Sequence, residues 1–316
     1  MFSVEARAVL HIPRIVLYLA LASVVIVWGL NSVAVKRAVS DIDPLGFTAL
    51  RFLVMAPLTL VLAGVFRSSL RFARRDLSML MACAACGYGI NQYFWVLGLA
   101  HTSAFAASLL GTMSPLFVLV MLASFGYERI GSGRWLGAVT ALLGVAIFEG
   151  AFNGRFHVRL GDGLTLVSAA IFAGYTIISS RLLDRYSPVS LLTITLLMGT
   201  LMLIPGGVYA LVHHTSKNIS AVDWWIFVYS VIFPIVLTYP IWSYGITRIG
   251  AARTALFHFL VPIVAGIASV FLLGARITNY EAIGAAVCIC GMIGSQVLGE
   301  LSLRTLWAQM ALPSDH

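Results

Sequence analysis

Long apolar blocks separated by short polar connections set the pattern of this chain. Each block runs for about twenty residues without strand-like alternation, which is the length that a helix needs to cross a bilayer core of about 30 Å. Turn and charge signals separate the blocks, such as Asp41-Ile-Asp-Pro44, Gly131-Ser-Gly133 and Ser187-Pro188. The pattern therefore predicts an all-α integral membrane protein with ten transmembrane helices. The predicted spans are 15–36, 44–66, 77–99, 103–125, 131–150, 161–182, 188–212, 224–246, 251–273 and 280–298.

Composition and charge exclude several other classes of protein. Of the 316 residues, 60% are hydrophobic and only 10% are charged, whereas soluble domains carry about 25% charged residues. The net charge of +8 arises from basic residues scattered between apolar blocks, so we expect no nucleic-acid partner. The sequence has no phosphate-binding GxxxxGKS/T segment, and its CxxC pair, Cys83 and Cys86, has no second pair at zinc spacing. We therefore expect no cofactor, no metal site and no ATP-driven pumping.

An internal repeat divides the chain into two halves. A shift of 147 residues, from Asp76 to Asp223, aligns identical residues along the stretch that ends at Gly144. The aligned pairs are Asp76 and Asp223, Trp95 and Trp242, Gly98 and Gly245, Ala104 and Ala251, Pro115 and Pro262, Arg129 and Arg276, Gly137 and Gly284, and Gly144 and Gly291. Each half, 1–150 and 151–316, holds five spans, so the second half must enter the membrane from the opposite face. Two inverted five-helix repeats are typical of secondary transporters, whose site lies where the repeats meet.

The basic residues of the connections predict how the chain sits in the membrane. With the N-terminus in the cytoplasm, 13 of the 20 Lys and Arg residues lie on the cytoplasmic side and six lie outside, while Arg51 falls within a span. Cytoplasmic connections of membrane proteins carry the excess of Lys and Arg. We therefore expect both termini, including the short tail of the second repeat, to be cytoplasmic.

Short motifs lie at the ends of several spans. The first span carries Val27-Trp-Gly-Leu-Asn-Ser-Val-Ala-Val-Lys36, and the second begins with Ala49-Leu-Arg-Phe52. The third and fourth spans are joined by Trp95-Val-Leu-Gly-Leu-Ala-His-Thr-Ser-Ala104, and the fourth ends at Gly126-Tyr-Glu-Arg129. With these motifs the chain resembles the EamA family of ten-helix permeases in the drug/metabolite transporter superfamily, although Gly274-Ala-Arg276 lacks the family's glutamate in the second half. The resemblance implies a permease of the bacterial inner membrane that exports amino acids, other small metabolites or toxic compounds.

Two polar stripes at repeat-related positions predict the translocation site. In the third span, one helical face carries Tyr88, Asn91, Gln92 and Trp95. The shift of 147 residues places on the matching face of the eighth span Ile235, Thr238, Tyr239 and Trp242. A membrane helix turns such a stripe to protein or to a water-filled cavity, so we expect both stripes to line a central cavity for a small amphipathic solute. The alternative is that Asn91 and Gln92 only tie helices together.

Polar and special residues inside other spans supply further candidates. The additional candidates for contact with the solute are Asn31, Ser108, Tyr175 and His258. A proton relay at His258 would make protons the coupling ion, and a hydrogen-bonded packing histidine is the alternative. Arg51 and Glu149, near the outer ends of their spans, are predicted to pair as a structural clamp or gate. Pro115 and Pro262 lie in the middle of equivalent spans and are predicted to be flex points.

These patterns favour a secondary transporter that moves small amphipathic metabolites by alternating access, and the family resemblance implies amino acids or related solutes and outward transport. A multidrug or toxic-compound efflux permease is the nearest alternative. A membrane-embedded enzyme would need nucleophile–base pairs, paired carboxylates or metal-ligand clusters within the spans, and none is present, so we expect no enzymatic activity. A channel would favour a ring of pore-lining charges or a filter loop, which the sequence also lacks. The expected partners are a small-molecule solute, the lipid bilayer and protons as a candidate coupling ion.

Overall fold

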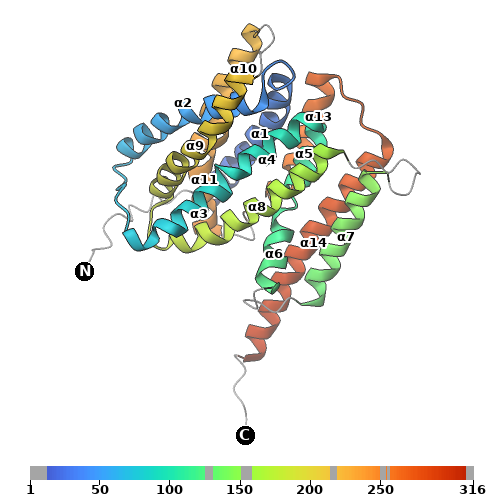
Figure 1. Ribbon diagram of the computed structural model, residues 1–316. Helices are drawn as coiled ribbons and strands as arrows, with labels where there is room; N and C mark the ends of the chain where they lie inside the picture. The colour runs from blue at the N-terminus through green and yellow to red at the C-terminus, as the bar shows by residue number, and fades with distance from the viewer. Residues whose placement is uncertain are drawn as a thin grey trace.

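A computed structural model of the chain describes residues 13–124, 131–150, 159–213, 219–249, 254 and 257–310, which form helices joined by short turns (Figure 1). The first half contains α1 (Arg14–Ala38), α2 (Pro44–Val65), the 3-10 turn η1 (Arg74–Asp76), α3 (Leu77–Gly87), α4 (Ile90–His101), α5 (Ala104–Gly111), α6 (Ser114–Ser124) and α7 (Ser132–Phe148). The second half contains α8 (Leu160–Leu183), α9 (Pro188–His213), α10 (Ala221–Val231), the π-helical segment η2 (Ile232–Leu237), α11 (Thr238–Ile249), α13 (Val261–Leu273) and α14 (Asn279–Met310). The predicted all-α fold is confirmed for the described residues, which include no strand.

Six helical stretches in the described parts of the chain are long and apolar enough to cross a bilayer, and α7 and α13 are apolar but shorter. The six are Arg14–Ala38, Pro44–Val65, Ala104–Ser124, Leu160–Leu183, Pro188–Ala210 and Ala221–Gly245. Large apolar side chains lie on the outside of the helices: Val61, Leu136 and Phe271 are 64%, 65% and 81% exposed. Hydrocarbon requires such a surface because lipid tails offer no hydrogen bonds. The chain is therefore a multi-pass membrane protein, while the count of ten spans stays a prediction.

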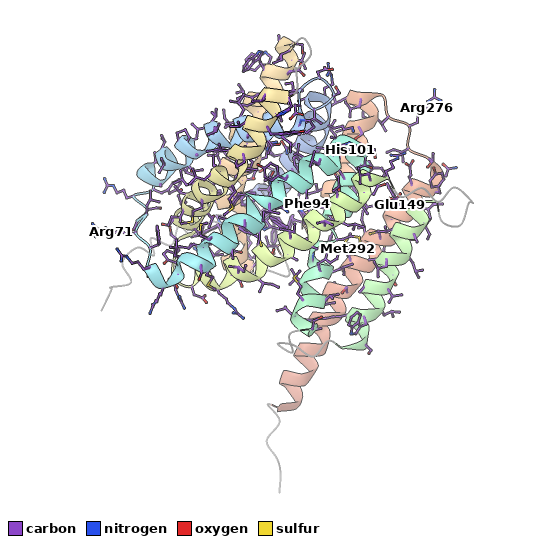
Figure 2. The ribbon with its side chains drawn as sticks, in the orientation of Figure 1. Arg71, Phe94, His101, Glu149, Arg276 and Met292 are labelled. Carbon is purple, nitrogen blue, oxygen red and sulfur yellow. The ribbon has the colours of Figure 1, made fainter. Side chains whose placement is uncertain are left out.

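Charged residues lie at opposite ends of this helical body. Figure 2 shows Arg71, before α3, at one end of the molecule and Arg276, after α13, at the other. The loop charges predict that Arg71 is cytoplasmic and Arg276 is outside. The placement of these two residues at opposite ends agrees with that prediction, because a membrane protein keeps such charges out of the hydrocarbon layer.

Interrupted helices replace the continuous third and eighth spans that the hydrophobic pattern predicts. The third span breaks at Tyr88 and Gly89, between α3 and α4. The eighth widens into the π-helical segment η2 between α10 and α11, around Pro234. Proline has no N–H to donate to the preceding turn, and a π-helical widening accommodates it. The two interruptions coincide under the repeat shift, which places Tyr88 on Ile235.

The fourth and ninth spans are also interrupted, which corrects the expectation that Pro115 and Pro262 bend continuous helices. The fourth span stops at the end of α5, and Pro115 is the second residue of α6. In the ninth span, Phe259 and Leu260 form a turn, and Pro262 is the second residue of α13. Both prolines thus occupy the first turn of a new helix, where a missing N–H costs nothing. The interruptions precede the prolines and match each other under the repeat shift.

Glycines at repeat-related positions let α7 and α14 pack backbone to backbone, and the two helices lie side by side in Figure 1. A Cβ atom at Gly137 would lie 2.7 Å from the carbonyl oxygen of Gly291. One at Gly284 would lie 2.8 Å from the carbonyl oxygen of Gly144. These two contacts exchange under the shift of 147 residues. Residue numbers rise along α7 as they fall along the facing side of α14, so the equivalent helices are antiparallel.

The helices α2 and α9 form a second antiparallel pair of equivalent helices. The Thr193 hydroxyl donates to the carbonyl oxygen of Thr59 at 3.1 Å. Further along, the Thr200 hydroxyl lies 3.4 Å from the carbonyl oxygen of Phe52. The helices α2 and α9 pack together within the main body of the molecule, and α7 and α14 lie to one side of it (Figure 1). Antiparallel packing of equivalent helices is the geometry that an inverted repeat predicts.

Candidate translocation site

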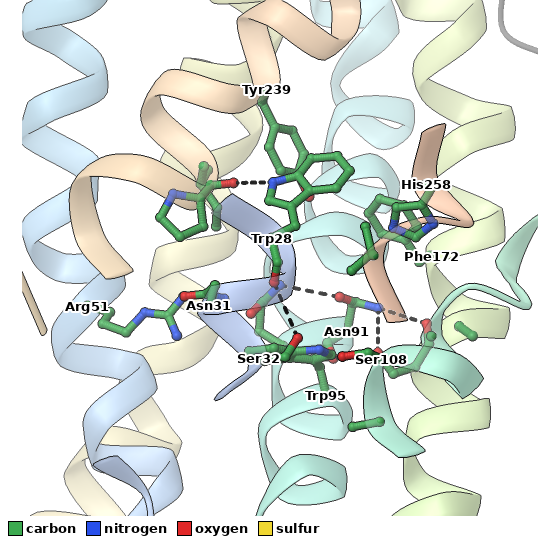
Figure 3. Close-up of a pocket in the computed structure, with 18 residues that line it drawn as sticks. Trp28, Asn31, Ser32, Arg51, Asn91, Trp95, Ser108, Phe172, Tyr239 and His258 are labelled. Carbon is green, nitrogen blue, oxygen red and sulfur yellow. Dashed lines mark hydrogen bonds between the residues drawn. The ribbon is translucent and has the colours of Figure 1, made fainter. Parts of the chain in front are cut away.

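A central cavity of about 150 Å³ lies between the two halves (Figure 3). Its lining residues are Trp28, Asn31, Ser32, Arg51, Asn91, Gln92, Trp95, Ala107, Ser108, Gly111, Ser168, Ala169, Phe172, Pro234, Ile235, Tyr239, His258 and Val261. All four interrupted spans contribute. Asn91 follows the break after α3, Gly111 ends α5, Pro234 lies in η2, and His258 and Val261 flank the turn before α13. Interrupted helices that border a central cavity are a recurrent feature of secondary transporters.

Trp28 connects the α1 wall of the cavity to η2. Its Nε1 donates to the carbonyl oxygen of Pro234 at 2.9 Å and to Oγ1 of Thr238 at 2.8 Å. Its ring lies 4.9 Å from that of Trp242 and 5.4 Å from that of His258, between ring centroids. An indole needs a partner for its N–H when buried, and the loosened backbone of the π-helical segment supplies it. The aromatic wall is therefore fixed by hydrogen bonds as well as by ring contacts.

The amides of the α4 stripe have unequal numbers of partners. Asn91 Nδ2 donates to the carbonyl oxygen of Ser168 at 2.8 Å and to its hydroxyl at 3.0 Å. Gln92 Nε2 reaches only Asn91 Oδ1, at 3.4 Å. The alternative of a helix tie therefore applies to Asn91, which joins α4 to α8 while it also borders the cavity.

The structure brings seven of the eleven predicted solute contacts to the cavity wall. These seven are Asn31, Asn91, Gln92, Trp95, Ser108, Tyr239 and His258. The other four, Tyr88, Tyr175, Thr238 and Trp242, pack behind the wall. The hydroxyls of Tyr88 and Tyr175 are 3.2 Å apart, and the Tyr88 ring lies 5.8 Å from that of Tyr239. They brace the lining residues instead of forming the surface of the cavity.

Sequence reasoning missed part of the lining although a helical period marks it. Trp28 and Ser32 share a face of α1 with Asn31, at spacings of three and four residues. Ser168 and Phe172 share a face of α8 with the predicted Tyr175. The same criterion that selects the stripe in α4 would have selected both of these faces.

Arg51 and Glu149 do not form the predicted ion pair. Arg51 is 1% exposed and lines the cavity, with its guanidinium carbon 5.6 Å from the Phe47 ring centroid and 6.0 Å from that of Trp95. Glu149 follows α7 directly, and its charged neighbours are Asp162 in α8, Arg159 just before α8 and Glu281 in α14. Among the residues that the structure describes, Arg51 Nε and Nη1 and Glu149 Oε1 have no hydrogen-bond partner. The pairing prediction is wrong because α7 packs on α14, whereas Arg51 turns from α2 into the centre.

Asp76 and Asp223, which the repeat shift equates, hold charged contacts at opposite ends of the molecule. At the end that is predicted to be cytoplasmic, Asp76 Oδ1 lies 2.5 Å from Arg185 Nη1, and the Tyr186 hydroxyl donates to Oδ2 at 2.9 Å. At the other end, Asp223 Oδ1 lies 3.9 Å from Arg37 Nη1 and has no hydrogen-bond partner. At this second end the buried Thr102 hydroxyl also donates to Asp162 Oδ1, so polar contacts join the halves at both ends.

The fold and the site together define a class of protein. A multi-pass helical body with matching halves encloses a cavity of amides, hydroxyls and aromatic rings, and in the described part of the chain no group of three His, Cys, Asp or Glu residues could hold a metal ion. This is the architecture of a membrane transporter. The chain belongs to the EamA-like transporter family, whose sequence model matches residues 15–149 and again residues 159–295. The resemblance noted in the sequence is thereby confirmed.

Individual relatives carry transporter names. An uncharacterized transporter from Archaeoglobus fulgidus is 26% identical over 87% of this chain and 96% of its own length. A probable terminal-alkyne amino-acid exporter from Streptantibioticus cattleyicolor is 26% identical over 89% of this chain and 94% of its own. A probable amino-acid metabolite efflux pump from Escherichia coli is 25% identical over 85% and 91%. A crystal structure that shares 19% identity and covers 91% of this chain and 98% of its own has the same fold, with a TM-score of 0.66.

Proposed function

We propose that this chain is a secondary transporter of the bacterial inner membrane that exports amino acids or related amphipathic metabolites by alternating access around the central cavity. The observation that carries the proposal is the convergence of four interrupted helices, two from each half, on one cavity. Discontinuous helices at the repeat interface form the substrate sites of many secondary transporters.

The proposed architecture is two inverted five-helix repeats, 1–150 and 151–316, with ten spans and both termini in the cytoplasm. The two matches to the family model and the antiparallel packing of α7 on α14 support this division. The excess of Lys and Arg in one set of connections supports the orientation.

The chemistry of the cavity supports a small solute with both polar and apolar parts. Trp28, Phe172 and Tyr239 supply ring faces, and Asn31 and Gln92 supply amide groups. The relatives named as an amino-acid exporter and as amino-acid metabolite efflux pumps support the same substrate class and the outward direction.

Counterflow in proteoliposomes tests the proposal. We expect vesicles that contain the purified chain, preloaded with an unlabelled amino acid, to accumulate the same labelled amino acid for at least one member of a panel of the twenty. Ser108→Trp should abolish this uptake because the indole fills the cavity. Ser180→Trp, on the exposed side of α8, is the matched control and should transport at the wild-type rate.

Two results would contradict the proposal. One is the absence of counterflow for the whole panel, and the other is uptake by Ser108→Trp at the wild-type rate, because the solute would then cross elsewhere.

A further inference from the structure

Arg51 is a buried cation without an acid beside it. Its side chain enters the central cavity from α2, is 1% exposed, and leaves Nε and Nη1 without hydrogen bonds. The rings of Phe47 and Trp95 lie near its guanidinium carbon, but ring faces do not satisfy N–H donors in the guanidinium plane. The described lining residues include no Asp or Glu and no other Lys or Arg, so Arg51 gives the cavity one uncompensated positive charge.

Asn31 brings a second unused polar group to the same cavity. Its Oδ1 is buried and has no hydrogen-bond partner. In Figure 3, Arg51 reaches toward Asn31, and Phe172 and His258 lie on the other side of the view. Buried donors and acceptors without partners are costly unless a ligand completes them. An amide oxygen carries no net charge, so Asn31 cannot act as the counter-ion of Arg51.

We propose that Arg51 binds the carboxylate of the transported solute and that Asn31 Oδ1 accepts a hydrogen bond from a neighbouring ammonium or hydroxyl group. This inference rests on the proposed function and narrows its substrate class to small carboxylates. The planar fork of a guanidinium matches the two oxygens of a carboxylate. One guanidinium neutralises one carboxylate, whereas a phosphate monoester carries about 1.5 to 2 negative charges at pH 7. The rings of Trp28, Phe172 and Tyr239 then surround the apolar part of the solute.

Matched acids and amides test the carboxylate anchor. The purified full-length chain is titrated with L-leucine, L-phenylalanine and L-methionine, with the three carboxamides, and with 3-phenylpropionate, and binding is followed by thermal shift and by tryptophan fluorescence. We expect the wild type to bind each acid at least 10-fold more tightly than its amide. Arg51→Gln should lose about 10- to 100-fold in affinity for the acids and little for the amides. Arg51→Lys should lose less, and the exposed Arg71→Gln should behave as wild type.

The melting temperature of the protein without solute tests whether Arg51 has only a structural role. Removal of an uncompensated buried charge should leave the melting temperature of Arg51→Gln equal to or above that of the wild type, whereas loss of a structural clamp would lower it. The role of the second group is tested in parallel. Asn31→Ala should weaken L-phenylalanine more than 3-phenylpropionate, which lacks the ammonium group.

The inference would be overturned if the wild type bound acids and amides with equal affinity. It would also be overturned if Arg51→Gln bound the acids as tightly as the wild type does. Counterflow of amides but not of acids would support the proposed transport and contradict the binding of a carboxylate by Arg51. Arg51-dependent binding of acids without any counterflow would support carboxylate binding by Arg51 and contradict the proposed transport. If neither acids nor amides bind, both proposals fail.

Discussion

Asn91 and Gln92 are neighbours on α4, yet their side-chain amides differ in what holds them. Asn91 donates two hydrogen bonds to Ser168 on α8, whereas Gln92 has one long contact within its own helix. Both border the cavity. The structure therefore separates a residue that joins two helices from one whose amide is available to a solute.

Alanine substitutions at these two positions should separate stability from affinity. Asn91→Ala removes two buried hydrogen bonds between α4 and α8 and should lower the free energy of unfolding by about 1–3 kcal/mol. Gln92→Ala should change stability little and weaken solute affinity by about 1–3 kcal/mol, because a group of the bound solute then loses its partner. Thermal unfolding and equilibrium binding measure the two effects. If Gln92→Ala binds as the parent does, the Gln92 amide does not contact the solute and this part of the proposed site is wrong.

The sequence predicts most of the α4 wall and half of the wall around Tyr239, and it predicts the environment of Arg51 poorly. The stripe through Asn91 and the one through Tyr239 are visible because polar residues recur at helical spacing and the repeat shift relates them. The helical spacing of Trp28, Asn31 and Ser32 marks the α1 wall in the same way, although the sequence prediction includes only Asn31. The sequence position of Arg51 indicates its depth in the membrane and therefore suggests a gate. The direction of its side chain depends on which helices pack beside α2, which the sequence does not show.

Interrupted helices are the elements that shape the site. Each of the four breaks exposes backbone groups or turns side chains toward the cavity, and the breaks match between the halves. The hydrophobic pattern predicts each of these spans as continuous. Hydropathy cannot register a break because the residues on both sides of it remain apolar. It also does not report tertiary contacts such as that at Gly89, where a Cβ atom would lie 2.7 Å from the Met202 sulfur.

Pro115→Ala should slow transport without loss of binding. The new N–H can donate to the preceding turn, which favours fusion of α5 and α6 into one stiffer helix. Solute affinity should stay within about 0.5 kcal/mol, because Pro115 does not line the cavity. Pro57→Ala, at an exposed position inside the continuous α2, is the matched control and should transport at the parental rate. Initial rates and equilibrium binding in the same preparation distinguish the outcomes, and an unchanged rate in Pro115→Ala would show that this break does not move.

The contact between α7 and α14 should depend on specific glycines. A Cβ atom at Gly144 would lie 2.2 Å from the backbone nitrogen of Cys288, so Gly144→Ala must push the two helices apart. We expect the free energy of unfolding to fall by about 1–3 kcal/mol. Gly294→Ala in α14 meets no atom within 4 Å and should leave stability unchanged or slightly higher. Equal melting temperatures for the two variants would contradict the close approach of the helices.

At the scale of the whole molecule, the two halves meet around the cavity and polar contacts join them at both ends. Asp76 pairs closely with Arg185 at the end that we predict to be cytoplasmic, whereas Asp223 and Arg37 are 3.9 Å apart at the other. A transporter that alternates must release one of these ties while the other forms. In the proposed mechanism, the Asp76–Arg185 contact is the tie that must open for access from the predicted cytoplasmic side.

Accessibility of a single cysteine in the cavity tests alternating access most directly. In a chain whose four free cysteines (Cys83, Cys86, Cys288 and Cys290) are replaced, Ser108→Cys supplies one thiol on the cavity wall. We expect a membrane-impermeant maleimide to label it from at least one side of the membrane, a carboxylate solute to protect it, and Asp76→Asn to shift labelling toward the cytoplasmic side. Transport through this cavity would be contradicted if the thiol were labelled from neither side. It would also be contradicted if neither the solute nor Asp76→Asn changed the labelling.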